Sequence, residues 1–293
     1  MESILGHLED KVNSILRHED RHVQREVENA FAHAKTESEE HARQEQKEKA
    51  PVLAVTSLGP GEVEKLFHLQ ISQSTNHWDL TPNERRLTPQ HLRNALADYG
   101  FALSGGSENE AKMRRHIEAV MFTTLAALGE SDSGNARDSI ALSRLIHFEL
   151  GRDMKLPWIK AGRKCIVSGR TDYSLWHGDA GHIEANMLVV EAKKRGESGT
   201  SQALSYMAML HHARRKAGRN DTSVYGIATD SYHWAFLYLD IHSEYTVFRY
   251  DWDHGYAVEI ILTLVKVMRH ASRLAASSES RRGSLEEMAG VEY

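Results

Sequence analysis

The chain is 293 residues long, enough for one large domain or two small ones, and its net charge is −5. Hydrophobic residues make up 41% of it and charged residues 26%, a typical composition for a folded protein in water. The acidic balance argues against wrapping nucleic acid over the whole surface but leaves room for a local basic face. A single cysteine, Cys165, excludes an internal disulfide and a multi-cysteine metal site.

No apolar run approaches the about 18 residues that are needed to span a bilayer. The first residues, MESILGHLEDK, lack the basic and apolar regions of a secretory signal. We therefore expect no membrane partner and a location in the cytoplasm or nucleus.

Residues 1–50 carry many charges of both signs, with apolar residues three or four apart, such as Ile4, Leu8 and Val12. This spacing predicts a charged helical arm, a candidate coiled coil through which two copies of the chain would associate. A solvated or partly disordered arm fits the same composition. Residues 51–109 alternate weak apolar patches with turns such as SLGPGE, which predicts a linker with a small helical region.

Residues 109–129 have the apolar spacing of a helix, and we predict a second helix over 137–151. The period then changes, and strands are expected over 156–162, 163–176 and 186–194. A helix over 201–218, strands over 223–230, 233–241 and 244–252, and a helix over 259–276 follow. The predicted fold class is α/β, with a mixed central β-sheet flanked by helices, and with a flexible tail over 276–293.

Two acidic residues and a lysine are expected at the ends of neighbouring strands. Glu191 and Lys193 are two residues apart and so project from the same side of their strand, while Asp172 lies on the preceding strand. Two carboxylates with the Ala192 carbonyl between them form an all-oxygen site suited to Mg²⁺ or Mn²⁺. With the lysine, this set favours metal-assisted phosphodiester hydrolysis. The alternative is an exposed cross-strand charge pair.

The helix over 201–218 adds two features. Gln202 and Tyr206 are four residues apart and share one helical face. The helix ends in a basic cluster of candidate phosphate ligands that includes Arg214 and Arg215. A zinc site is disfavoured because the adjacent histidines His211 and His212 cannot share a helical face.

Asp172, the sequence Glu191-Ala192-Lys193 and the Gln202–Tyr206 helix resemble the PD-(D/E)XK, or restriction-endonuclease-like, nuclease superfamily, in particular its RecB-like branch. The chain also resembles fungal proteins of this fold. The resemblance implies an αβββαβ core within residues 110–275. Thr171 stands where the motif name has proline.

The resemblance implies a Mg²⁺-dependent nuclease acting on DNA, or on RNA, largely without regard to sequence. Asp172 and Glu191 would be metal ligands together with the Ala192 carbonyl, and Lys193 would be the catalytic lysine. Gln202 and Tyr206 would support the site, and a first-helix acid, Glu118 or alternatively Glu110, would join the metal. The competing expectations are an inactive nuclease fold used for nucleic-acid binding or assembly, and a nuclease-type toxin or effector.

Overall fold

The structure is a computed structural model that describes residues 11, 25, 27–36, 50–74, 76–82, 90–103, 109–131, 146–177 and 186–270. The chain divides into two compact units, Met1–Pro51 and Val52–Tyr293. In the first unit, residues 27–36 are helical. The remainder of the predicted arm, its pairing with a second copy and the predicted tail over 276–293 lie outside the described residues.

The second unit is built on a mixed sheet, and its described part contains eight strands. Seven follow the order β1-β4-β5-β6-β7-β8-β2, and β3 pairs with the free side of β4. The neighbours β3, β4 and β5 are antiparallel, β5 and β6 are parallel, and β6, β7 and β8 are antiparallel. The strands are β1 (Val52–Ala54), β2 (Gln70–Ile71), β3 (Ile146–Lys160), β4 (Arg163–His177), β5 (Asn186–Ala192), β6 (Val224–Thr229), β7 (His233–Leu239) and β8 (Glu244–Asp251).

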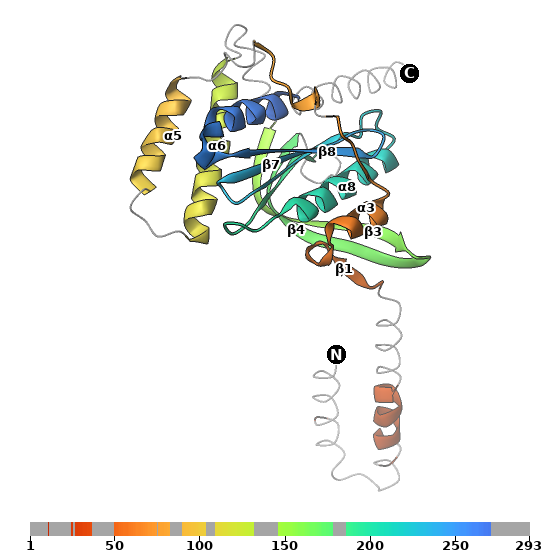
Figure 1. Ribbon diagram of the computed structural model, residues 1–293. Helices are drawn as coiled ribbons and strands as arrows, with labels where there is room; N and C mark the ends of the chain where they lie inside the picture. Colours follow the sequence, from red (N-terminus) through yellow and green to blue (C-terminus); the bar gives the residue numbers. More distant parts are fainter. Residues whose placement is uncertain are drawn as a thin grey trace, which may run out of the picture. The chain divides into compact units, whose positions relative to one another are not determined.

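Helices cover both faces of this sheet (Figure 1). On one face, α8 (Thr200–Lys216) and α3 (Pro60–Phe67) enclose the first apolar core. On the other face, α6 (Glu110–Ser131) and the helix over residues 257–270 enclose the second core, and α5 (Gln90–Leu103) packs against α6. Short helical turns η2 (Val55–Ser57), η3 (Asn76–Trp78) and η6 (Trp252–Tyr256) complete the described elements. The predicted mixed α/β class is confirmed.

The strand β6 lies at the centre of the sheet and is largely apolar along its length. All residues of β6 are buried, as expected of a strand that has helices on both faces and strands on both sides. Gly226 lets α8 approach this strand, because a Cβ atom there would overlap the sulfur of Met207. None of the helices that the structure describes is long and apolar enough to cross a membrane.

Two regions differ from the sequence prediction. Residues 52–71 are not a linker, because β1 pairs in parallel with β4, β2 pairs with β8, and α3 buries Val63 and Phe67 in the first core. These elements are too short to show a hydrophobic period in the sequence. The helix predicted over 137–151 is replaced from Ile146 onward by β3, because pairing along the whole length of β4 overrides local helix propensity. Residues 137–145 lie outside the described part.

Candidate active site

The three predicted site residues lie together where β4 and β5 adjoin. Tyr173 of β4 is paired with Val190 of β5, so Asp172 and Glu191 come next in the register and are adjacent. The backbone amide of Ala192 donates a hydrogen bond to Asp172 Oδ2 at 2.8 Å. The amide of Lys193 donates to the carbonyl of Thr229 in β6 at 2.9 Å, which continues the parallel pairing past the end of β5. Backbone pairing therefore fixes all three positions.

Glu191 is a buried carboxylate, and only one of its two oxygens accepts a hydrogen bond. Its residue is 3% exposed, and Lys193 Nζ donates to its Oε1 at 2.7 Å. Its Oε2 is buried without a hydrogen-bond partner. Burial raises the pKa of Glu191 to about 7, although the hydrogen bond from Lys193 opposes this change. The site thus contains a buried oxygen that lacks a compensating proton donor or cation.

Arg114 of α6 is a site residue that the sequence analysis missed. Its Nη2 donates to Asp172 Oδ1 at 2.8 Å, and its Nε donates to Glu110 Oε1 at 3.1 Å. Burial works against the charge of Arg114, but the hydrogen bond and the negative charge of Asp172 outweigh it and raise its pKa. The spacing of four residues between Glu110 and Arg114 was the available signal, since it places both on one helical face.

The predicted first-helix metal ligand is not part of a metal cluster. Glu118 Oε1 accepts a hydrogen bond from the hydroxyl of Tyr173 at 3.3 Å, and Glu110 is occupied by Arg114. Within the described ranges, no three His, Cys, Asp or Glu side chains gather as a metal-binding group. Neither acid of α6 joins Asp172 and Glu191 in such a group, and the metal-binding role of Glu118 or Glu110 stays a prediction. The side chain that reaches Asp172 from α6 is that of Arg114.

Tyr206 supports the strand that carries Asp172. Its ring is buried, and its hydroxyl donates to the carbonyl of Arg170 at 2.9 Å. Gly169 permits this contact, because a Cβ atom there would lie 2.6 Å from the hydroxyl oxygen. Burial first, and then the negative charges of Glu191 and Asp172, raise the pKa of Tyr206. Gln202 lies one turn earlier in α8 and is half-buried.

The two predicted phosphate ligands at the basic end of α8, Arg214 and Arg215, lie in different environments. Arg214 is buried, and its guanidinium donates to the carbonyl of Ser223 just before β6. This arginine therefore attaches the helix to the sheet, and its role in binding phosphate stays a prediction. Arg215 is exposed in the same turn. Of the two, only Arg215 presents its side chain to solvent.

Three other polar or aromatic side chains, His211, Trp176 and Cys165, are buried within the fold. His211 is buried, with Nδ1 2.9 Å from the carbonyl of Thr222 and Nε2 3.1 Å from Ser243 Oγ, and burial lowers its pKa. Trp176 is buried and donates to Ser174 Oγ at 3.0 Å. Cys165 is buried.

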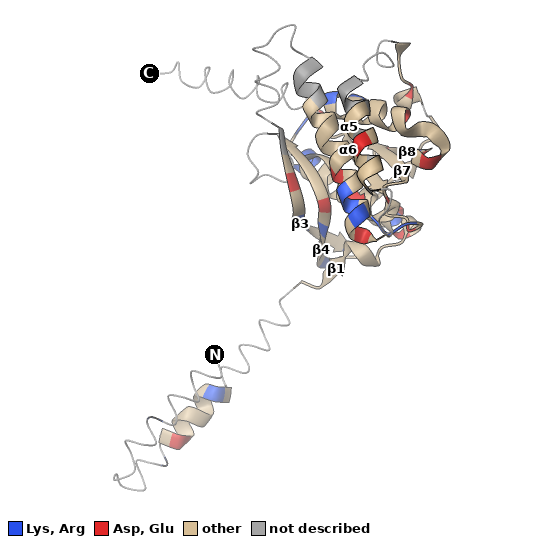
Figure 2. Cartoon of the chain, turned by 90° about the vertical axis from the view of Figure 1, so that its left-hand side faces the viewer, with Lys and Arg blue, Asp and Glu red and all other residues tan. Residues whose placement is uncertain are grey.

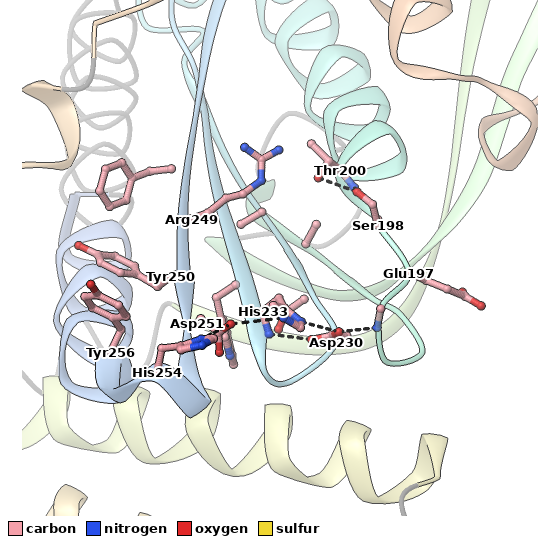
Figure 3. A pocket seen from close by; sticks show the side chains of 17 residues that line it. Glu197, Ser198, Thr200, Asp230, His233, Arg249, Tyr250, Asp251, His254 and Tyr256 are labelled. Carbon is pink, nitrogen blue, oxygen red and sulfur yellow. Dashed lines mark hydrogen bonds and ion pairs between the residues drawn. The ribbon is translucent and has the colours of Figure 1, made fainter.

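A pocket of about 670 Å³ adjoins the site (Figure 3). Gly199 separates the two, because a Cβ atom on it would lie 3.0 Å from Glu191 Cγ and 3.1 Å from Lys193 Cγ. On one wall, His233 Nδ1 is 2.9 Å from Asp230 Oδ2, so this carboxylate raises the pKa of the imidazole. The same pocket is also lined by Ser198, Thr200, Ala228, Ala235, Arg249 and Asp251.

Comparison with models of known protein families gives no match, and no curated protein is significantly similar to the chain. The interpretation of the site therefore depends on its geometry and on the chemistry of its residues.

Proposed function

We propose that the protein is a metal-dependent nuclease that hydrolyses phosphodiester bonds, more readily in DNA than in RNA and with little dependence on sequence. The observation that carries this proposal is the meeting of Asp172 and Glu191 on adjoining strands, with Lys193 Nζ 2.7 Å from Glu191 Oε1. The chain order also supports it. Helix α6, the antiparallel strands β3 to β5, helix α8 and the parallel strand β6 follow the αβββαβ order that the resemblance implies.

The residues present fit a divalent cation. Hard cations such as Mg²⁺ bind carboxylate oxygens, and Glu191 Oε2 is such an oxygen, buried and without a partner. Asp172 would supply the second carboxylate, and the Ala192 carbonyl remains the third ligand that the resemblance implies. When bound, the cation would make a water molecule more acidic and neutralise charge that develops on the phosphate.

The chain itself would contribute orientation and positive charge. The ammonium of Lys193 is held against Glu191, where it would bind a phosphate oxygen or orient the attacking water. The Ala192 amide fixes one oxygen of Asp172, and Tyr206 holds the backbone of Arg170, two residues before it. Each of these contacts is made before substrate arrives, so little reorganisation is needed during the reaction.

Cleavage of nucleic acid by the purified full-length chain tests the proposal. Circular and linear duplex DNA, single-stranded DNA and RNA are incubated with Mg²⁺ or Mn²⁺. We expect Lys193→Ala and Glu191→Gln to reduce the rate about 100-fold or more, in line with the loss of a positioned catalytic group. Glu197→Gln, which changes an exposed acid in the following loop, is the matched control. Full activity of Lys193→Ala would refute the assignment.

One observation favours a second candidate, an inactive nuclease fold that serves in nucleic-acid binding or assembly. Both oxygens of Asp172 are already satisfied, by Arg114 and by the Ala192 amide. The guanidinium of Arg114 thus occupies a position next to Asp172 where an active site would hold its cation. Calorimetric titration with Mg²⁺ separates the two candidates. Binding that is lost in Glu191→Gln supports the enzyme, and no binding in the wild type supports the inactive fold.

A further inference from the structure

The hairpin of β3 and β4 continues past the active site as a ribbon, which we define as Asp153–Arg170 and which β1 joins by pairing with Ile166–Ser168 of β4. Here β4 is no longer next to β5, whose pairing with β4 is confined to Tyr173–Trp176. The inner face of the ribbon is apolar, with Met154, Leu156 and Val167 buried in the first core. The outer face is formed by the alternate residues, from Lys155 and Ile159 on β3 to Lys164 and Arg170 on β4. The inner face of the ribbon therefore packs on the first core, and its outer face is left for contact with another molecule.

The ribbon is basic in an acidic protein. It contains five Lys or Arg residues and a single acidic one, whereas the whole chain has a net charge of −5. Lys155 and Lys164 lie on its outer face, and Lys160 and Arg163 are paired at its tip. All four side chains are exposed (Figure 2 shows the charges along the chain). This concentration of charge creates a local positive field.

The cations of the ribbon differ from those around the active site in their ion pairing. Near the site, Arg114 is paired with Asp172, Lys193 with Glu191, and Arg152 with Glu149. On the ribbon, only Arg170 has a carboxylate partner, Asp153, at 3.8 Å, and both of these side chains are well exposed. In the part of the chain that the structure describes, the other four cations have no ion pair. Their charge is therefore available to an external anion.

The dimensions of the ribbon fit a nucleic-acid duplex. From the row of Arg170 to the tip is seven residues, about 23 Å at the rise of a strand, which corresponds to about seven base pairs. The same strand, β4, reaches Asp172 two residues after Arg170. A duplex lying along the ribbon would thus have one backbone beside the candidate active site.

The side chains of the outer face favour a duplex over a single strand. Proteins that bind single strands stack the bases on aromatic side chains. No outer-face residue is aromatic, from Asp153 through Ile159 on β3 to Lys164 through Arg170 on β4. The tryptophan of the ribbon, Trp158, points to the inner face, where its ring centroid is 4.9 Å from that of Phe67.

We propose that the outer face of the β3–β4 ribbon binds the phosphate backbone of a nucleic-acid duplex and holds one strand next to Asp172 and Glu191. This inference deepens the proposed nuclease function and rests on it for the purpose of the contact. Binding itself requires no metal ion and no cleavage, so it is measured separately.

The test is fluorescence anisotropy with the full-length chain and a 30-base-pair DNA duplex, in EDTA and over a range of salt concentrations. For the double variant Lys155→Gln/Lys164→Gln, two fewer phosphate contacts should lower the slope of log K against log salt by about 1.8 and weaken binding by about 30-fold at 0.15 M salt. The matched control is Lys35→Gln/Lys65→Gln, which removes the same charge from exposed positions on the helix of residues 27–36 and on α3 and should bind like the wild type. A single strand of the same length and an RNA duplex are measured in parallel.

The variant Lys155→Arg/Lys164→Arg keeps the charge and should retain binding, which guards against an effect of misfolding. Wild-type affinity in Lys155→Gln/Lys164→Gln, an equal loss in the control, or binding of single strands alone would overturn the inference. If the wild type cleaves nucleic acid but the ribbon variants bind normally, the inference fails and the proposed function stands. If the ribbon binds duplex but nothing is cleaved in Mg²⁺, the catalytic proposal fails and the ribbon assignment stands.

Discussion

Replacing Glu191 with glutamine should make the metal-free protein more stable at pH 8 while abolishing catalysis. The carboxylate is buried with one oxygen unpartnered, and burial raises its pKa from 4.5 to about 7. The folded state therefore binds this proton more tightly than the unfolded state does. The stability that the protonated group contributes is complete below pH 4.5 and is lost as the pH rises to about 7.

The magnitude follows from the same two pKa values. At about 1.4 kcal/mol for each pKa unit, the difference between 4.5 and about 7 corresponds to about 3 kcal/mol at pH 8. Glutamine avoids this cost because it has no charge to bury. For a domain of more than 200 residues, 1 kcal/mol changes Tm by about 2–4 °C, so we expect a rise of about 6–12 °C.

Thermal unfolding of both proteins in EDTA at pH 5 and pH 8 measures this effect. The gain should be present at pH 8 and small at pH 5, where the wild-type carboxyl is already protonated. Mg²⁺ should stabilise the wild type at pH 8, by about 1.4 kcal/mol at ten times its Kd, but not Glu191→Gln. Glu197→Gln is the control for loss of an exposed charge. A destabilised Glu191→Gln at pH 8, or an equal gain at both pH values, would refute the reasoning.

Two further predictions concern residues on either side of the sheet. Burial lowers the pKa of His77 from 6.5 to about 4, so the stability that neutral His77 contributes is present above pH 6.5 and lost as the pH falls to about 4. His77→Gln should therefore reduce the difference between the free energies of urea unfolding at pH 7 and pH 4.5 by about 1 kcal/mol, less than the full pKa shift implies because the side chain is partly exposed to solvent. An unchanged difference would contradict this account. Gly199→Ala should lower the cleavage rate about tenfold or more with little change in Tm, because its Cβ would lie 3.0 Å from Glu191 Cγ and 3.1 Å from Lys193 Cγ. In the control Gly61→Ala, where a Cβ meets no atom within 4 Å, activity should be unchanged and helix α3 slightly more stable, and a matching loss of activity there would show that the effect is not local.

Long, strongly patterned segments were predictable from the sequence. The apolar run of β5, the helix α8 and the strands β6 to β8 were expected from their periodicity, and the structure has them close to the predicted positions. Asp172, Glu191 and Lys193 were also predictable as neighbours, because an antiparallel pair of strands fixes which residues lie side by side.

Other features depend on contacts between distant parts of the chain. The segment 137–151 had a helical pattern, yet from Ile146 it forms β3 because β4 offers a partner along its whole length. Arg214 and Arg215 are neighbours in a basic cluster, but the helical turn directs the first toward the sheet and the second toward solvent. Local sequence does not contain this information.

The sequence by itself determined which residues carry the acidic, basic and apolar character of this protein, and the order in which its main strands and helices follow one another. Only the tertiary structure decided that Arg114 rather than Glu118 reaches Asp172, and that one oxygen of Glu191 is buried without a partner. It also decided that, among the described residues, four of the five cations of the ribbon have no ion pair and only Arg170 has one. The physical reason is that periodicity depends on residues within one or two turns of each other. Burial and ion pairing depend instead on the residues that folding brings together from distant positions.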